Sequence, residues 1–204
     1  QQLDEQGRVH TRTPGMEEQQ AQDYFPGQLL LALATHPVDD DGKKRIGRAL
    51  RRYVSRWQAQ QTLGPVSWLM QALAAWSVLL EDRALARHCI SLGEWIMRWQ
   101  LRSSGGFITA QQDDTPGFTT GVYLEGLAAA WCNGLVPAAR RKVWRGALEQ
   151  GLAFLDSLSL GAGDAPILPN ADFAHGGVCH GPHRPLVRLD YTSHALGAVL
   201  DLLE

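Results

Sequence analysis

The chain has 204 residues, 45% of them apolar and 20% charged, with a formal net charge of −2 at pH 7. This length is typical of one domain with a sizeable core, so we treat residues 1–204 as a single domain, which could be part of a longer protein. The near-neutral charge gives no reason to expect nucleic acid as a partner, and no apolar run is long enough to predict a membrane helix.

The pattern of apolar residues predicts an all-α protein of about seven helices. In chain order they cover residues 23–35, 41–61, 66–80, 82–101, 119–132 and 137–158, with a last helix that ends near Leu203. The second, fourth and sixth helices have one apolar stripe, which is typical of an outer helix. The third, fifth and last are apolar nearly all round, which is typical of an inner, buried helix. Inner and outer helices are therefore expected to alternate.

Four of these helices contain the same short motif. If His194 is aligned with Glu125, Gln71 and Leu31, the segments H-A-L-G-A, E-G-L-A-A, Q-A-L-A-A and L-A-L-A-T fall into register. Each copy then presents a variable, often polar position beside a constant small and leucine-rich stripe. This is how several inner helices line a common centre.

A glycine-containing segment precedes three of the inner helices. Gly105-Gly106-Phe107 and Gly176-Gly177-Val178 lie before two of them, and Gly7-Arg8-Val9 resembles a degenerate first copy. We expect short extended hairpins at these places and read residues 1–22 as extended rather than helical. The repeat is thus an extended Gly-Gly element, an inner helix and an outer helix.

This alternation, with G-G-F…L-E-G-L-A-A-A-W and G-G-V…R-L-D-Y-T-S-H-A-L, resembles the α/α-toroid group. That group includes six-hairpin glycosidases, N-acylglucosamine 2-epimerase-like proteins, terpene cyclases and lanthionine cyclases. The resemblance implies an incomplete α/α toroid, because a complete ring needs about twelve helices. Another domain or protomer would then complete it. As a likeness of fold, it implies function only by analogy.

The long polar loops all lead into the N-terminal ends of the predicted inner helices, so we expect the functional site at that end. Helix N-termini also favour anionic groups. Aromatic rings beside charged groups are typical of a saccharide site. The candidates for binding are Asp23, Tyr24, Trp68, His180, Arg188 and Tyr191, with His10, Asp113, Asp114 and His183 nearby.

Asp190 and His194 form the sharpest predicted catalytic pair, because a spacing of four residues places them on one helix face. Asp190 would orient the imidazole and raise its pKa, giving an acid or base near neutral pH. The structural alternative pairs Asp190 with Arg188. Glu125, among leucine, alanine and glycine, is expected to be paired or catalytic. Asp113 and Asp172 could form a carboxylate pair for glycosidic chemistry, or could simply be solvated.

The three cysteines, Cys89, Cys132 and Cys179, are too widely spaced to predict a disulfide framework, which favours a soluble protein of a reducing compartment such as the cytoplasm. The W-C-N-G around Cys132 and the V-C-H-G around Cys179 and His180 resemble the zinc-ligand motifs of lanthionine cyclases. We expect no such zinc site, because Cys132 ends one helix whereas Cys179 precedes the start of another. A local zinc site of Cys179, His180 and His183, with His175, is the alternative.

These observations lead to three hypotheses. The first is a carbohydrate-active hydrolase, lyase or epimerase without a cofactor, acting on a saccharide that could be anionic, with Asp190, His194 and Glu125 as its catalytic groups. The second is a non-catalytic module that binds a peptide or a glycan. The third is a zinc-dependent, lanthionine-cyclase-like protein.

Overall fold

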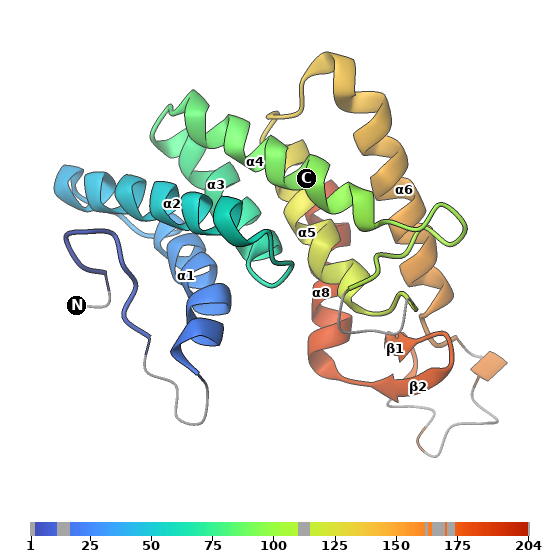
Figure 1. Ribbon diagram of the computed structural model, residues 1–204. Helices are drawn as coiled ribbons and strands as arrows, with labels where there is room; N and C mark the ends of the chain where they lie inside the picture. Colours follow the sequence, from blue (N-terminus) through green and yellow to red (C-terminus); the bar gives the residue numbers. More distant parts are fainter. Residues whose placement is uncertain are drawn as a thin grey trace.

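The computed structural model describes residues 3–11, 17–109, 115–161, 163–164, 170 and 174–203. It is an all-α protein with short hairpins (Figure 1). The α-helices are α1 (Glu18–Ala34), α2 (Asp40–Gln60), α3 (Val66–Leu79), α4 (Arg83–Ile96), α5 (Thr119–Cys132), α6 (Arg141–Ser157) and α8 (Leu189–Leu203). Two 3₁₀ turns, Met97–Trp99 and Ala138–Arg140, extend α4 and precede α6, and β1 (Cys179–Gly181) pairs antiparallel with β2 (Arg184–Val187).

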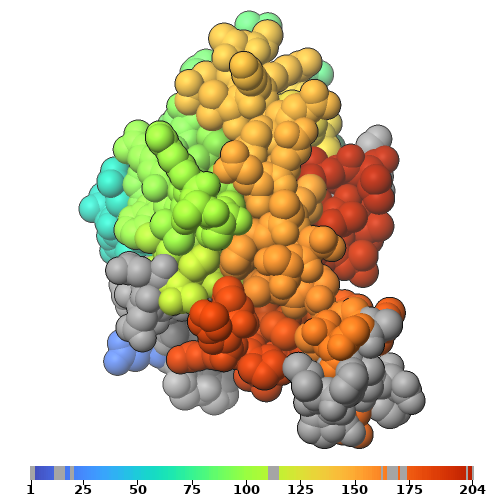
Figure 2. Space-filling model, turned by 90° about the vertical axis from the view of Figure 1, so that its right-hand side faces the viewer, coloured from blue at the N-terminus to red at the C-terminus, as the bar shows by residue number. Residues whose placement is uncertain are grey.

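The helices alternate between an inner and an outer layer, as the sequence predicts. The inner helices α1, α3, α5 and α8 form a row in which each packs on the next. Outside them, α2 and α4 pack on α3, and α6 packs on α5, so that the row forms an open arc. Figure 2 shows α6 running down the outer face beside α4. In the parts of the chain that the structure describes, no helix is both long and apolar enough to cross a membrane.

Small residues allow the inner helices to approach closely. A Cβ atom at Gly27 of α1 would lie 2.6 Å from Trp68 Cβ of α3, and one at Gly121 of α5 would lie 3.0 Å from Ala195 N of α8. Between these two contacts, the Ser67 hydroxyl of α3 donates to the Val122 carbonyl of α5. Gly27, Ser67 and Gly121 occupy the same position of the repeated motif, so the same position of each of these helices contacts the next helix in the row.

The predicted Gly-Gly hairpins are confirmed at three places. Isolated β-bridges join Leu3 to Val9, Gln100 to Phe107 and Ser159 to Val178. In each, the glycine two residues before the bridged position has a positive φ: 77° at Gly7, 80° at Gly105 and 77° at Gly176. The bridged residues Val9, Phe107 and Val178 are buried, and each backbone N–H donates to a hydroxyl, of Tyr53, Thr120 and Thr192 respectively.

The helix boundaries differ from the sequence predictions at α1. This helix begins at Glu18 rather than Asp23, and Pro26 lies inside it rather than in its first turn. The reason is tertiary: Gln22 is buried, donates to the Val9 carbonyl at 2.7 Å and accepts a hydrogen bond from the Tyr53 hydroxyl at 2.7 Å. These contacts stabilise a helix in a polar segment whose composition predicts a loop.

The prediction of a fourth buried helix is wrong for α8. One face packs on α5 through Tyr191, Ala195 and Ala198, which are buried. The opposite face leaves large apolar side chains exposed. Those of α8 are Leu189, Leu196, Val199, Leu200 and Leu203, and we call these five residues the α8 stripe.

Candidate functional site

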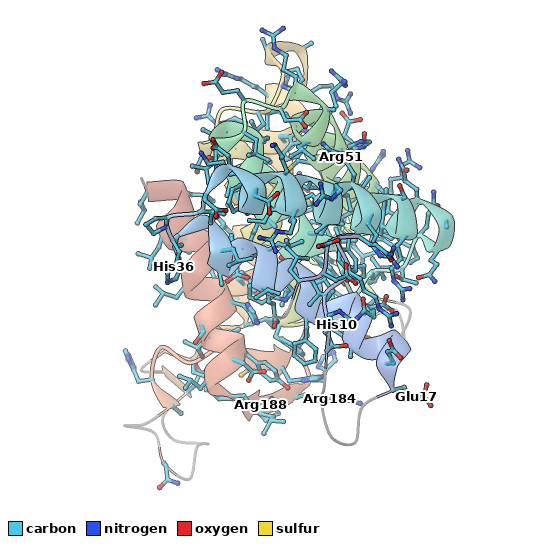
Figure 3. The ribbon with its side chains drawn as sticks, turned by 90° about the vertical axis from the view of Figure 1, so that its left-hand side faces the viewer. His10, Glu17, His36, Arg51, Arg184 and Arg188 are labelled. Carbon is cyan, nitrogen blue, oxygen red and sulfur yellow. The ribbon has the colours of Figure 1, made fainter. Side chains whose placement is uncertain are left out.

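The N-terminal ends of the inner helices lie on one side of the molecule. In Figure 1, α1, α5 and α8 begin on the side that carries β1 and β2. In Figure 3, Glu17, just before α1, and Arg188, just before α8, lie low in the view, and Arg51 of α2 lies high. The predicted site residues therefore come from elements that share one end of the arc.

Glu125 of α5 and His194 of α8 form a hydrogen-bonded pair across two inner helices. Glu125 Oε2 lies 2.9 Å from His194 Nδ1, and only 11% and 21% of the two side chains is exposed. The contact depends on Gly197, since a Cβ atom there would lie 2.4 Å from Glu125 Oε1. The two residues occupy equivalent positions of the repeat, so the close packing of α5 and α8 brings them together.

The environment of His194 favours its charged form. The hydrogen bond to Glu125 raises the pKa of His194 above its ordinary value, against the opposing effect of burial, and the charges of Glu125 and Asp190 add to the rise. Trp68 of α3 lies edge-on to the imidazole, with ring centroids 5.8 Å apart and an interplanar angle of 65°. With Nδ1 held by Glu125, Nε2 is the ring nitrogen left to exchange a proton with a ligand.

The expected hydrogen bond between Asp190 and His194 is not formed. Asp190 instead makes a bidentate ion pair with Arg188, at 2.9 Å from Nε to Oδ1 and 3.0 Å from Nη2 to Oδ2. The side chains of both residues are about half exposed. Because Arg188 and Asp190 are two residues apart, two N–H groups of the guanidinium reach both carboxylate oxygens. This ion pair forms in place of a hydrogen bond from Asp190 to His194, which lies one helical turn away. Asp190 acts on His194 through its charge alone.

An aromatic cluster, separate from the Glu125–His194 pair, forms where the β1–β2 hairpin meets the N-terminal ends of α5 and α8. Phe118 stacks on Tyr191, with centroids 3.7 Å apart, and the Tyr191 hydroxyl lies 3.0 Å from His180 Nδ1. The Phe118 N–H donates to the His180 carbonyl, and the Arg188 guanidinium lies over the Tyr191 ring at 5.1 Å. The sequence predicted His180, Tyr191 and Arg188 as residues of this end of the molecule but did not predict Phe118. The signal that could have identified Phe118 is its position directly before a buried helix.

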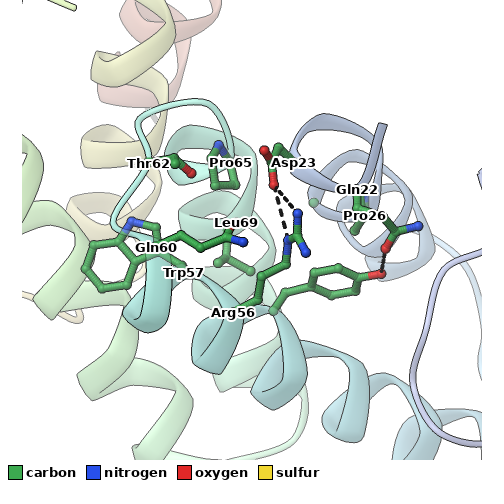
Figure 4. A pocket seen from close by; sticks show the side chains of 11 residues that line it. Gln22, Asp23, Pro26, Arg56, Trp57, Gln60, Thr62, Pro65 and Leu69 are labelled. Atoms are coloured by element: carbon green, nitrogen blue, oxygen red, sulfur yellow. Dashed lines mark hydrogen bonds and ion pairs between the residues drawn. The ribbon is translucent and has the colours of Figure 1, made fainter. Parts of the chain in front are cut away.

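Asp23 belongs to a separate hollow at the start of α1 and α3 (Figure 4). There it forms an ion pair with Arg56 of α2, at 2.8 Å from Oδ1 to Nη2, which ties α1 to α2. The ring of Tyr24 lies beside Gly64, where a Cβ atom would be 3.2 Å from it, and burial together with Tyr24 raises the pKa of Tyr123 on α5. The lining of this hollow includes neither Glu125 nor His194.

In the part of the chain that the structure describes, the cysteines do not belong to a cluster of metal-binding side chains. None of the three cysteines forms a disulfide, and among the described residues no three His, Cys, Asp or Glu side chains lie close enough together to hold a metal ion. The alternative set of Cys179, His180 and His183 is therefore not gathered, and burial raises the pKa of the Cys179 thiol. Cys132 ends α5, whereas the His180 carbonyl accepts from Phe118 at the other end, about 20 Å away along a 14-residue helix.

The remaining residues singled out from the sequence lie apart from these clusters or outside the described residues. His10 is exposed in the N-terminal hairpin, where its Nε2 lies 3.4 Å from Asp4 Oδ2. Asp113, Asp114 and Asp172 lie outside the described residues. Cys89 is a core residue, as predicted, and burial raises the pKa of its thiol to about 12.

A scan against protein-family models, a search of curated proteins and a search of solved structures find no match to this chain.

Proposed function

We propose that the Glu125–His194 pair is the acid–base centre of an enzyme that acts on a saccharide. The observation that carries the proposal is the 2.9 Å hydrogen bond between two partly buried side chains that come from different inner helices. A carboxylate among small apolar residues is costly unless it is paired, and this one is paired with a group whose second nitrogen is available for proton transfer.

The pair favours proton transfer at a sugar carbon over two-carboxylate hydrolysis. Glycosidases use two carboxyl groups about 5–10 Å apart, whereas this pair joins one carboxylate to a histidine. A neutral histidine whose Nδ1–H is held by a glutamate is suited to accept at Nε2 a proton from a carbon beside a carbonyl or carboxylate group, as the base of an epimerase or lyase does. Glu125 then stabilises the imidazolium ion that forms.

The surroundings of the pair support a sugar as the substrate. Trp68, half-exposed beside His194, offers an apolar face for a pyranose ring. Arg188, half-exposed, would meet the carboxylate of a uronate by giving up its ion pair with Asp190. The sequence likeness to the glycosidases and epimerases of the α/α-toroid group suggests the same substrate class by analogy.

The proposal is tested by following deuterium exchange in sugars. The protein is incubated in D₂O with uronate-containing oligosaccharides and with N-acylated amino sugars, and the loss of individual sugar C–H signals is followed by proton NMR. We expect exchange at one carbon by the wild-type protein, and a loss of at least about 100-fold in His194→Gln and in Glu125→Gln. Glu149→Gln, which changes an exposed carboxylate on α6, is the control and should retain full exchange.

Two results would contradict this proposal. If His194→Gln exchanged deuterium at the wild-type rate, the Glu125–His194 pair would not take part in the proton transfer. A glycan that binds on an array, with neither exchange nor cleavage, would instead favour a binding module.

A further inference from the structure

The α8 stripe is exposed although the equivalent positions of the inner helices α3 and α5 are buried. Leu196 is 55% exposed, whereas its counterparts Leu127 of α5 and Leu73 of α3 are fully buried. Val199 is 39% exposed, and its counterparts Ala130 and Trp76 are 0% and 2% exposed. The helices α3 and α5 therefore show how the face that is exposed on α8 is buried in these other copies of the repeat.

An outer helix packs on the corresponding face of α3 and α5. On α5, Leu124 lies against Gly151 of α6, where a Cβ atom would be 2.7 Å from Leu124 Cδ2. On α3, the equivalent Met70 lies against Gly93 of α4, where a Cβ atom would be 3.0 Å from Met70 Cε. Each outer helix thus places a glycine over the same position of its inner helix.

On α8 this position is Ser193, which is exposed and lies on the same face as Leu189, Leu196 and Leu200. Their spacing of three, four and seven residues makes one continuous apolar face. Among the described residues no outer helix packs on this face, whereas the opposite face packs on α5.

We propose that the α8 stripe is the seat of a further outer helix, an amphipathic helix of the α4 and α6 type that continues the repeat. Its apolar residues recur every three or four positions, like Leu85, Cys89, Leu92 and Ile96 of α4, all of which are fully buried. The proposed helix carries a side chain larger than glycine where it faces Ser193. Serine is smaller than Leu124 and Met70, which face the glycines of α6 and α4, so it leaves space for a larger side chain.

The test supplies such a helix and measures thermal stability. Residues 133–158, which contain the loop and α6, are appended directly after Asp201, the repeat equivalent of Cys132. We expect the melting temperature to rise by about 4 °C or more, independently of protein concentration. Leu196→Glu should cancel this gain in the extended chain, yet change the melting temperature of the original chain by less than about 2 °C, because Leu196 is already half exposed.

A second graft guards against a failure of the first to fold. Residues 81–99, which contain α4, are appended after Leu203, the repeat equivalent of Leu80. The proposal is overturned if neither graft raises the melting temperature. It is also overturned if the original chain sediments as a dimer at micromolar concentration and Leu196→Glu makes it a monomer, since a second copy would then occupy the stripe.

Discussion

Glu125 and His194 show how one hydrogen bond couples the packing of two helices to the charge of an imidazole. Both side chains are mostly withdrawn from water, and each is costly there unless the other is present. Because the pKa of His194 is raised in the folded protein, the folded state binds this proton more tightly than the unfolded state does. The stability that the pair contributes must therefore depend on pH.

The direction of this dependence is a first prediction. The contribution of the pair should be fully present below the pKa of an unfolded histidine, about 6.5, and should be lost as the pH rises through the higher folded value. The difference in melting temperature between the wild-type protein and His194→Gln should therefore be larger at about pH 6 than at about pH 9. A difference that grows toward alkaline pH would contradict it.

Gly197 gives a second prediction at the scale of one residue. A methyl group there would lie 2.4 Å from Glu125 Oε1, so Gly197→Ala should push the carboxylate away from His194. We expect a loss of about 1–3 kcal/mol of stability and a lower pKa for His194. Gly146→Ala on α6 is the matched control, because its Cβ atom would meet nothing within 4 Å. It should stabilise the protein by about 0.4–1 kcal/mol in thermal unfolding. Equal effects of the two substitutions would exclude a special role for Gly197.

At the scale of the element, the repeat could be predicted from the sequence because it is periodic. The alternation of inner and outer helices and the glycine hairpins all follow from local patterns. The start of α1 could not be predicted, since it depends on the contacts of Gln22 with Val9 and Tyr53. Nor could the partner of His194: spacing within one helix pointed to Asp190, whereas the actual partner, Glu125, depends on the close approach of two helices.

The glycine hairpins give a third prediction. Gly105 and Gly176 both have positive φ, but a Cβ atom at Gly105 would also lie 2.2 Å from the Gln150 carbonyl oxygen, whereas one at Gly176 would meet nothing within 4 Å. Gly105→Ala should therefore cost more than about 2 kcal/mol, and Gly176→Ala about 1 kcal/mol, in chemical denaturation. The reverse order would contradict the claim that the close approach of Gly105 to Gln150 adds to the cost.

At the scale of the whole molecule, the row of inner helices is covered unevenly. α3 and α5 are packed between neighbouring helices, while α8 has one covered and one exposed face. Local stability follows the number of packed faces, so the backbone amides of α8 should exchange with deuterium faster than those of α3 and α5. Hydrogen-exchange mass spectrometry measures this directly. Equal protection of α8 and α5 would mean that the α8 stripe is covered in solution.

The central claim is that Glu125 and His194 form a coupled acid–base pair, and an NMR titration of the imidazole tests it most directly. Carbon and nitrogen shifts of His194 are followed against pH in the wild-type protein and in Glu125→Gln, with Glu149→Gln as the control. The pKa of His194 should lie above 6.5 in the wild-type protein and in the control, and should fall in Glu125→Gln. A wild-type pKa at or below 6.5, unchanged by Glu125→Gln, would contradict the claim.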